Sequence, residues 1–137
     1  MSVDFDKFNS VISLFDKQST ALSEKPYLWH KIDNEYLPLT WKQVRNKVEK
    51  LSIVLKNLGI LKGDRVVIVS ENRPEWQISD LAIMAIGAIT VPAYITNTTT
   101  DHEYIIKHSG ARCLILSNHN LAQKVLPAVA KCSQCQT

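Results

Sequence analysis

A charged turn is the part of this sequence that best fits an anion-binding site. It follows the β-branched run Val66–Val69 and precedes a helical pattern, and helix N-termini bind phosphates when glycines let the backbone approach. None of the four glycines lies in the turn, and Pro74 removes one backbone donor. We interpret Asn72 or Ser70 as the cap of the helix. The charged neighbours are interpreted as solvated side chains: Glu71, Arg73 and Glu75.

A second candidate is the CxxC pair Cys132 and Cys135, which has the spacing of half a zinc site or of a redox pair. Zinc needs four ligands, and only Cys113 or a histidine such as His119 could complete the set. A redox pair usually opens a helix after a strand, whereas this pair closes the chain. We therefore interpret both thiols as part of a frayed tail and predict no metal site.

None of the four histidines has the sequence spacing to a nucleophile that a catalytic pair would show. They are His30, His102, His108 and His119. His102 falls in the first turn of a predicted helix and His108 in its last turn, so both are predicted to lie at the surface. No serine, cysteine or lysine has a base at a spacing that would activate it. The sequence thus predicts no catalytic, cofactor-binding or metal-binding residue in these 137 residues.

The composition is that of one folded domain. The 137 residues are 45% hydrophobic and 21% charged, which is within the range of globular chains. The net charge of +3 is scattered along the chain, so nucleic-acid binding is not expected. The longest apolar stretch, Leu81–Ile95, is interrupted by Gly87, Thr90 and Pro92, and no transmembrane segment is expected.

The start of the sequence has no basic region followed by an apolar one, which predicts a cytoplasmic protein. Three cysteines are an odd number for a disulfide framework, and reduced thiols are expected.

The first half of the chain is predicted to form two helices separated by a hairpin. Apolar residues at helical spacing predict a helix over Phe5–Gln18. Residues 27–32 and 36–39 flank a polar turn and predict two paired strands. Thr40 has the capping-box spacing to Gln43, and a long amphipathic helix follows as far as Gly59.

The second half alternates strands and helices. The predicted strands are Val66–Val69, Ile89–Tyr94 and Arg112–Leu116. The first helix begins at Pro74, the second opens with a capping box of Thr100 and Glu103 and ends at Gly110, and the third, from about Asn118, is interrupted or kinked at Pro127. We therefore predict an α/β fold with a parallel βαβαβ sheet flanked by helices and right-handed crossovers.

The predicted helix around Trp76–Ile86 is apolar on nearly every side. One small sheet cannot cover all of these faces, and exposed apolar patches drive association. Self-association of the chain is expected for this reason.

Five short motifs occur in order along the chain. They are Leu39-Thr40-Trp41, Leu58-Gly59-Ile60, Lys62-Gly63-Asp64-Arg65-Val66, Glu71-Asn72-Arg73-Pro74-Glu75-Trp76 and Gly87-Ala88-Ile89-Thr90-Val91-Pro92. Their order and spacing resemble the adenylate-forming, AMP-binding enzyme superfamily. Further motifs narrow the resemblance to the long-chain fatty acyl-CoA synthetases: Tyr94, Thr96-Asn97-Thr98, Tyr104-Ile105 and His108-Ser109-Gly110-Ala111-Arg112. Ile95 departs from the pattern, since many relatives carry proline there.

The resemblance covers Leu28 to Asn118 and implies an ATP-dependent, magnesium-requiring ligase that makes an acyl-adenylate from a fatty acid and transfers the acyl group to CoA. It implies that the family's phosphate loop, acyl tunnel and C-terminal lysine domain lie downstream of Thr137. The matched motifs fit scaffold roles, such as Gly87 allowing close packing of a helix against a strand.

We accordingly expect residues 1–137 to be a partial N-terminal domain of a long-chain fatty acid-CoA ligase. We expect it to be inactive alone and to bind no cofactor, although the full-length enzyme would be cytoplasmic or peripheral to a membrane. Two alternatives stay open: a stand-alone interaction or regulatory module on the same scaffold, or one half of a split ligase.

Overall fold

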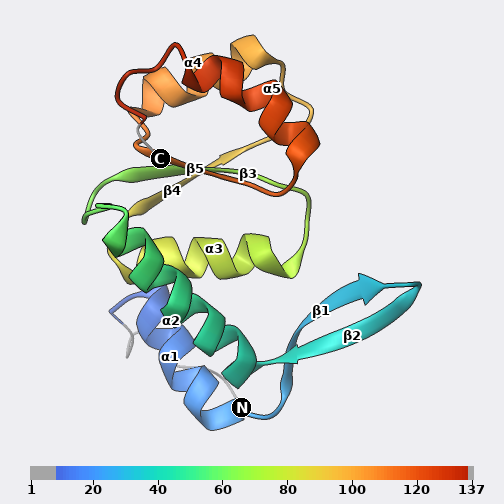
Figure 1. Ribbon diagram of the computed structural model, residues 1–137. Coiled ribbons are helices and arrows are strands. Elements are labelled where there is room, and N and C mark those ends of the chain that lie inside the picture. The colour runs from blue at the N-terminus through green and yellow to red at the C-terminus, as the bar shows by residue number, and fades with distance from the viewer. Residues whose placement is uncertain (1–8, 136–137) are drawn as a thin grey trace.

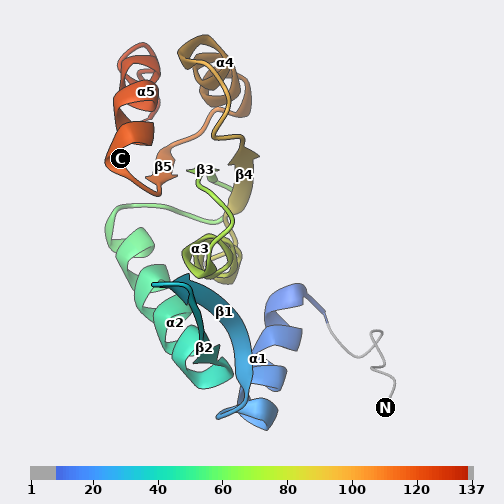
Figure 2. The same ribbon diagram turned by 90° about the vertical axis from the view of Figure 1, so that its right-hand side faces the viewer.

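A three-stranded parallel sheet forms the middle of the molecule, in a computed structural model that describes residues 9–135 (Figures 1 and 2). Strand β3 (Arg65–Val69) lies between β4 (Ile89–Ala93) and β5 (Cys113–Leu116). Both neighbours pair with β3 in parallel, with Val67 opposite Val91 on one side and Leu114 on the other. The predicted strands are confirmed to within one residue at each end.

Helices cover both faces of this sheet. Helix α3 (Pro74–Ala85) lies on one face, and α4 (Thr99–Ser109) and α5 (His119–Val129) lie side by side on the other (Figures 1 and 2). The predicted α/β fold class is confirmed, including the parallel βαβαβ order.

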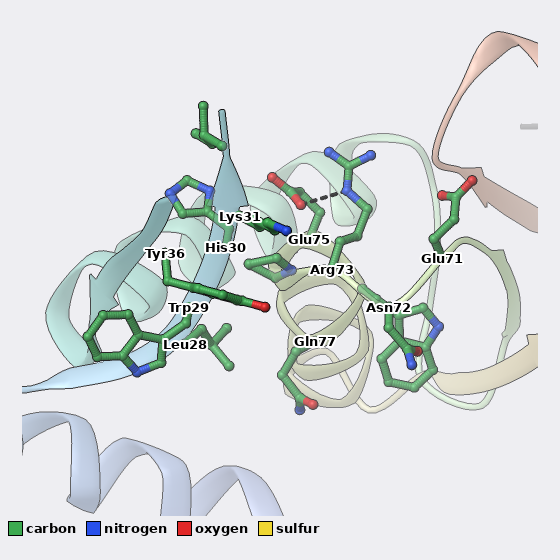
Figure 3. A pocket seen from close by; sticks show the side chains of 13 residues that line it. Leu28, Trp29, His30, Lys31, Tyr36, Glu71, Asn72, Arg73, Glu75 and Gln77 are labelled. Atoms are coloured by element: carbon green, nitrogen blue, oxygen red, sulfur yellow. Dashed lines mark hydrogen bonds and ion pairs between the residues drawn. The ribbon is translucent and has the colours of Figure 1, made fainter. Parts of the chain in front are cut away.

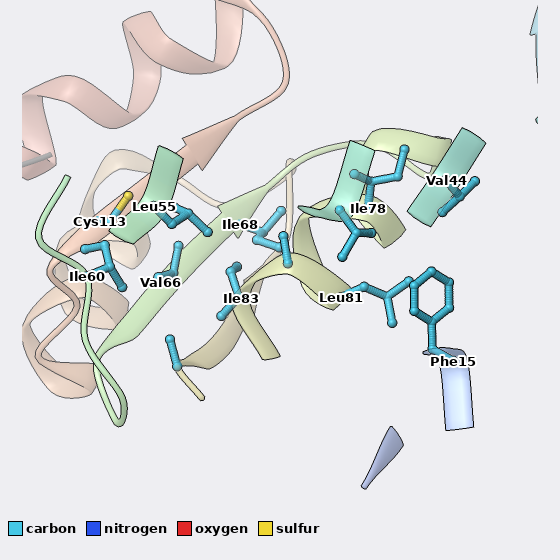
Figure 4. Packing of buried hydrophobic residues seen from close by; sticks show 13 residues of the cluster. Phe15, Val44, Leu55, Ile60, Val66, Ile68, Ile78, Leu81, Ile83 and Cys113 are labelled. Atoms are coloured by element: carbon cyan, nitrogen blue, oxygen red, sulfur yellow. The ribbon is translucent and has the colours of Figure 1, made fainter. Parts of the chain in front are cut away.

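Strand β3 supplies both cores through its alternating side chains. Val66 and Ile68 pack into a cluster with α2 and α3 (Figure 4), and Val67 and Val69 pack into a second cluster with α4 and α5. All four side chains are at most 1% exposed. A β-branched run suits this position because it packs well on both pleated faces.

The N-terminal half packs against α3 from the side opposite the sheet. It consists of α1 (Val11–Leu22), the hairpin β1 (Pro26–Ile32) and β2 (Glu35–Thr40), and α2 (Trp41–Asn57). The hairpin turn is Asp33 and Asn34, both at positive φ, one residue shorter than predicted because Glu35 pairs with Ile32. The rings of Phe15, Tyr27 and Trp41 join helix, hairpin and helix, and Tyr27 and Trp41 stack with centroids 3.8 Å apart.

The predicted first helix is wrong in its bounds. Its first residues, 5–8, lie outside the described residues, and α1 begins at Val11 because Ser10 caps it in a capping box with Ser13. The helix continues to Leu22, four residues beyond the predicted end. The hydroxyls of Ser19 and Thr20 both donate to the carbonyl of Asp16, so this polar stretch stays helical.

Capping boxes were predicted at the starts of two other helices, α2 and α4. Thr40 caps α2 as predicted, with its hydroxyl accepting from the Gln43 N–H at 3.2 Å and the Gln43 side chain accepting from the Thr40 N–H at 2.9 Å. The predicted capping box of α4 is wrong, because Thr98 and Asp101 form it. Glu103 instead pairs with Lys107 and with Lys131, which follows α5.

The predicted interruption of the last helix at Pro127 is wrong. Helix α5 continues through this residue to Val129. Val125, Ala128 and Cys132 are each at most 2% exposed, and their burial holds the last turn in place. Cys132 is therefore a core residue and not part of a frayed tail.

The expected exposed apolar face of α3 is also wrong. Ile78, Leu81, Ala82 and Ile83 are all buried, because α1, α2 and the hairpin cover the sides of α3 that the sheet does not reach. Self-association stays a prediction, but this helix no longer gives a reason for it. None of the helices within residues 9–135 is long and apolar enough to cross a membrane.

The motif around Asp64 and Arg65 fixes the edge of the sheet where the strands begin. The guanidinium of Arg65 donates to the carbonyls of Ser109, Gly110 and Gly63 at 2.6–3.1 Å, so it caps the C-terminus of α4. Asp64 accepts from the N–H of Leu61 and from Arg112. These contacts join the start of β3 to the start of β5.

Gly110 should tolerate alanine less well than Gly63 does. Both have positive φ (+62° and +85°), but a Cβ on Gly110 would lie 2.6 Å from the Arg65 guanidinium, whereas one on Gly63 would meet nothing within 4 Å. Gly63→Ala should lower the free energy of unfolding by roughly 1–2 kcal/mol from backbone strain. Gly110→Ala should cost about 3 kcal/mol, because it also disturbs charged hydrogen bonds. Equal losses in urea denaturation would contradict the role given to Arg65.

His102 is buried, contrary to its predicted surface position. It is 1% exposed between α4 and α5, and its Nε2 has no hydrogen-bond partner. Burial, and then the positive charge of Lys124, lower the pKa of His102 below its usual 6.5. The first turn of α4 packs against α5. The residues around His102 gave no indication of this contact.

This burial predicts a pH-dependent stability. Well above pH 6.5 the imidazole is neutral in both states; as the pH falls through 6.5, the unfolded chain binds a proton that the folded chain resists. The free energy of unfolding should therefore decrease between pH 7 and pH 5.5. His102→Leu should remove much of this slope, and His108→Leu, at an exposed site, should not. Urea titrations at several pH values would measure it, and identical slopes in all three chains would contradict the prediction.

Candidate functional site

The edge where the parallel strands end is the candidate site, because ligands of open α/β sheets bind beyond the carboxyl ends of the strands. The chain passes from β3 to β4 on one side and then returns to β5 on the other, so the strand order reverses between β3 and β5. Three polar residues meet at this switch point: Glu71 follows β3, and Ser117 and Asn118 follow β5.

The Glu71 carboxylate joins the two loops. It accepts hydrogen bonds from the Ser117 hydroxyl and from the Asn118 amide, the latter at 2.8 Å. The hydrogen bond from Ser117, together with the backbone and Asn118 donors, lowers the pKa of Glu71. The interpretation of Glu71 as a freely solvated side chain is wrong, because it spans two connections that the sequence separates by 46 residues.

The N-terminus of α3 lacks the predicted cap. Arg73 is the N-cap residue, and its side chain caps no backbone N–H of the helix; the Ser70 hydroxyl donates to the carbonyl of Glu71. Arg73 pairs with Glu75 in the first turn of the helix at 2.7 Å (Figure 3). Neither Asn72 nor Ser70 therefore caps α3.

The three helix N-termini at this edge differ in what they offer an anion. Thr98 caps α4 and Asn118 caps α5, each with its own side chain on a backbone N–H. At α3 the first residue is proline, and Glu71 and Glu75 lie close by. A phosphate would meet carboxylates here, so the arrangement suits the joining of loops better than the cradling of an anion.

An open hollow of about 1010 Å³ lies between the hairpin and the start of α3 (Figure 3). Aromatic side chains line it from both sides, with Trp29 and Tyr36 on the hairpin and Trp76 on α3. Trp29 is 54% exposed and Tyr36 66%. The polar lining residues include His30, Lys31, Arg73, Glu75 and Gln77. Such a wide, aromatic surface suits packing against another protein segment.

The cysteines are spread over both cores. Cys113 is buried on the α3 side of the sheet, whereas Cys132 is buried on the α5 side with Cys135 packed nearby. Burial, and then the neighbouring Cys135 thiol, raise the pKa of Cys113 to about 11, which makes it a poor nucleophile. His119 begins α5, about 15 Å along the helix axis from its end near Cys132. Within residues 9–135 the structure has no group of three or more His, Cys, Asp or Glu that could hold a metal ion.

Two other histidines contact residues four positions away along the chain, since His119 lies 3.1 Å from the Gln123 amide and His108 lies near Tyr104. His108 is exposed, as predicted, and its ring stacks on Tyr104. The contact of Glu71 with Ser117 and Asn118 was not predicted from the sequence. The available signal was that polar residues directly follow two predicted parallel strands, whose ends meet at one edge if the strands are neighbours.

Comparison with known proteins decides the family. Residues 15–137 match the AMP-binding enzyme family. The chain belongs to this family. The five motifs that suggested the adenylate-forming superfamily all lie within the matched residues.

Relatives within the AMP-binding family include enzymes named for fatty acids. The long-chain-fatty-acid–CoA ligase FadD15 of Mycobacterium tuberculosis is 36% identical over 94 residues, which are 69% of this chain and 16% of FadD15. Fatty acyl-CoA synthetase A of Dictyostelium discoideum is 32% identical over 111 residues, which are 81% of this chain and 16% of the relative. The chain thus spans about a sixth of the length of these relatives.

Solved structures of other proteins show the same fold. The coronafacic acid ligase of Pectobacterium brasiliense, in its R395G mutant form, matches 92% of this chain with a TM-score of 0.83 and 21% identity, over 24% of its own chain. The N-terminal subdomain of Klebsiella oxytoca NpsA matches 80% of this chain with a TM-score of 0.70 and 30% identity, over 28% of its chain. The predicted partial adenylate-forming fold is therefore confirmed.

The role of Glu71 can be tested at Asn118. Asn118→Asp keeps a cap for α5, since aspartate accepts the Leu121 N–H as well as asparagine does. It replaces the amide that donates to Glu71 by a carboxylate, so the two side chains should repel each other. We expect a lower urea midpoint for Asn118→Asp in the natural chain and little loss in a Glu71→Gln background, where glutamine can donate. The same loss in both backgrounds would show that Glu71 does not act on Asn118.

Proposed function

We propose that this chain is the opening segment of a long-chain fatty acyl-CoA synthetase. In this proposal the complete enzyme uses ATP and magnesium to convert a fatty acid to an acyl-adenylate and then transfers the acyl group to CoA. The observation that carries the proposal is the 36% identity to FadD15 within the segment that matches the family. The further fatty-acid enzymes among the relatives support the same substrate class.

We further propose that the chain is a scaffold segment and is inactive alone. The contacts of the matched motifs support this. Arg65 and Asp64 hold strand and helix ends, Thr40 caps α2, and Glu71 joins two loops. Gly87 follows α3 at positive φ, and its nearest neighbour is the Lys62 side chain. Gly87 therefore serves a turn, whereas close packing of a helix against a strand was expected. A cytoplasmic location stays part of the proposal.

Two assays test this. The purified chain should show no palmitate-dependent exchange of pyrophosphate into ATP, with FadD15 as the positive control. A chimera in which this chain's matched segment replaces the corresponding 94 residues of FadD15 should form palmitoyl-CoA, whereas FadD15 lacking the segment should not. Exchange by the isolated chain would contradict its inactivity. A folded but inactive chimera would contradict the assignment to this enzyme class.

A further inference from the structure

Helix α2 and the turn that follows it carry an excess of positive charge. Residues 41–63 contain six Lys or Arg and one Glu, whereas the net charge of all 137 residues is only +3. The helix gathers lysines that are spaced along the sequence onto one face, and exposed apolar side chains lie among them. We propose that this face rests on the surface of a membrane that contains anionic lipids. The α2 face consists of Lys47, Lys50, Ile53, Val54, Leu58, Leu61 and Lys62.

Salt bridges compensate the positive charges only near the start of the helix. Lys42 pairs with Glu24 at 3.2 Å, and Arg45 pairs with Asp16 and Glu49 at 2.8 and 3.0 Å. Four later lysines form no salt bridge with any acidic side chain of residues 9–135, and they are Lys47, Lys50, Lys56 and Lys62. The second half of α2 and its turn therefore present uncompensated positive charge.

Apolar side chains continue the row of lysines along the helix. Lys47, Lys50, Val54 and Leu58 follow one another at spacings of three, four and four residues, and such residues are neighbours on a helix surface. All four are exposed. Ile53 lies beside this row, three residues after Lys50, and is 60% exposed. A row of solvated lysines would not need these apolar neighbours.

The core holds the opposite side of α2 in place. Val44, Val48 and Leu55 are buried, and the helix packs on α1 and α3. It lies along one outer side of the molecule (Figure 2). The turn adds Leu61, which is 64% exposed. Within the described residues the α2 face is thus rigidly held and open to a partner.

The mixture of charge and apolar surface selects the partner. Nucleic acid would neutralise the lysines but would leave Ile53 and Leu61 without an apolar contact. A second copy would bring like charges together, and a folded protein would have to match the buried lysines with carboxylates. At a bilayer surface, lysine heads reach the lipid phosphates while Ile53 and Leu61 enter between the headgroups. The convex face of one helix suits such a flat partner.

The inference goes beyond the proposed function and does not require it. A long-chain fatty acid partitions into membranes, so this contact would bring the enzyme close to its substrate. The argument for the α2 face uses charge and exposure alone. Failure of vesicle binding would therefore leave the ligase proposal standing, and failure of the ligase assays would leave this inference standing.

Vesicle sedimentation tests the inference on the natural chain. Vesicles of phosphatidylcholine with about 30% phosphatidylglycerol would be compared with vesicles of phosphatidylcholine alone, at about 0.1 M and about 0.5 M NaCl. We expect binding to the anionic vesicles to be about tenfold tighter or more at low salt, and to weaken by a similar factor at high salt. Equal binding to both kinds of vesicle, or no binding to the anionic ones, would overturn the inference.

Two matched comparisons of variants locate the contact. Lys47→Gln with Lys50→Gln removes two charges from the α2 face, and the control, Lys25→Gln with Lys31→Gln, removes two exposed charges at the hairpin. Ile53→Ser removes an apolar side chain from the α2 face, and Val11→Ser removes one that is equally exposed on α1. Each α2 variant should weaken vesicle binding about fivefold or more relative to its control. Equal weakening in either comparison would overturn the inference.

Competition with poly-glutamate separates a lipid from an acidic protein. Ile53→Ser should weaken binding to vesicles and leave binding to poly-glutamate unchanged. Poly-glutamate binding as tight as vesicle binding, with no effect of Ile53→Ser on either, would assign the face to an acidic protein. Self-association that the lysine pair abolishes, without vesicle binding, would assign it to a second copy, and both outcomes overturn the inference. If a variant unfolds by circular dichroism, the lipid and salt dependence of the natural chain decides.

Discussion

Strand β3 is buried on both faces, and this burial holds the helices of both layers against the sheet. Its side chains alternate between the two cores, and among the described residues β3 is the one strand of this sheet with a neighbour on each side. Residues at the two ends of β3 also fix the positions of helix ends at both edges of the sheet. Arg65 holds the end of α4, and Glu71 holds the start of α5 through Asn118. One short segment thus positions most of the second half of the molecule.

The elements that local sequence determines could be predicted. The β-branched run became β3, the Thr40 box opened α2, and Gly110 ended α4 in the left-handed conformation. The errors concern residues whose surroundings come from distant elements. His102 and Cys132 are buried because α4 and α5 pack on each other and on the sheet. The sides of α3 are covered by α1, α2 and a hairpin that precede it in the chain.

The candidate site was predicted less well than the fold. Residue types showed a charged turn without glycine, but its hydrogen bonds depend on which strand lies beside β3. Only the return of the chain from β4 to the other side of β3 brings Ser117 and Asn118 to Glu71. The fold alone also does not choose a substrate, since solved relatives with this scaffold include ligases named for coronafacic acid and anthranilate. The fatty-acid proposal depends on the sequence relatives.

We propose that these residues are a scaffold and do not hold the nucleotide by themselves. Calorimetric titration of the purified chain with ATP and magnesium tests it most directly, since it measures binding without requiring the complete reaction. We expect no saturable heat. Saturable, magnesium-dependent binding of ATP with one site per chain would contradict it.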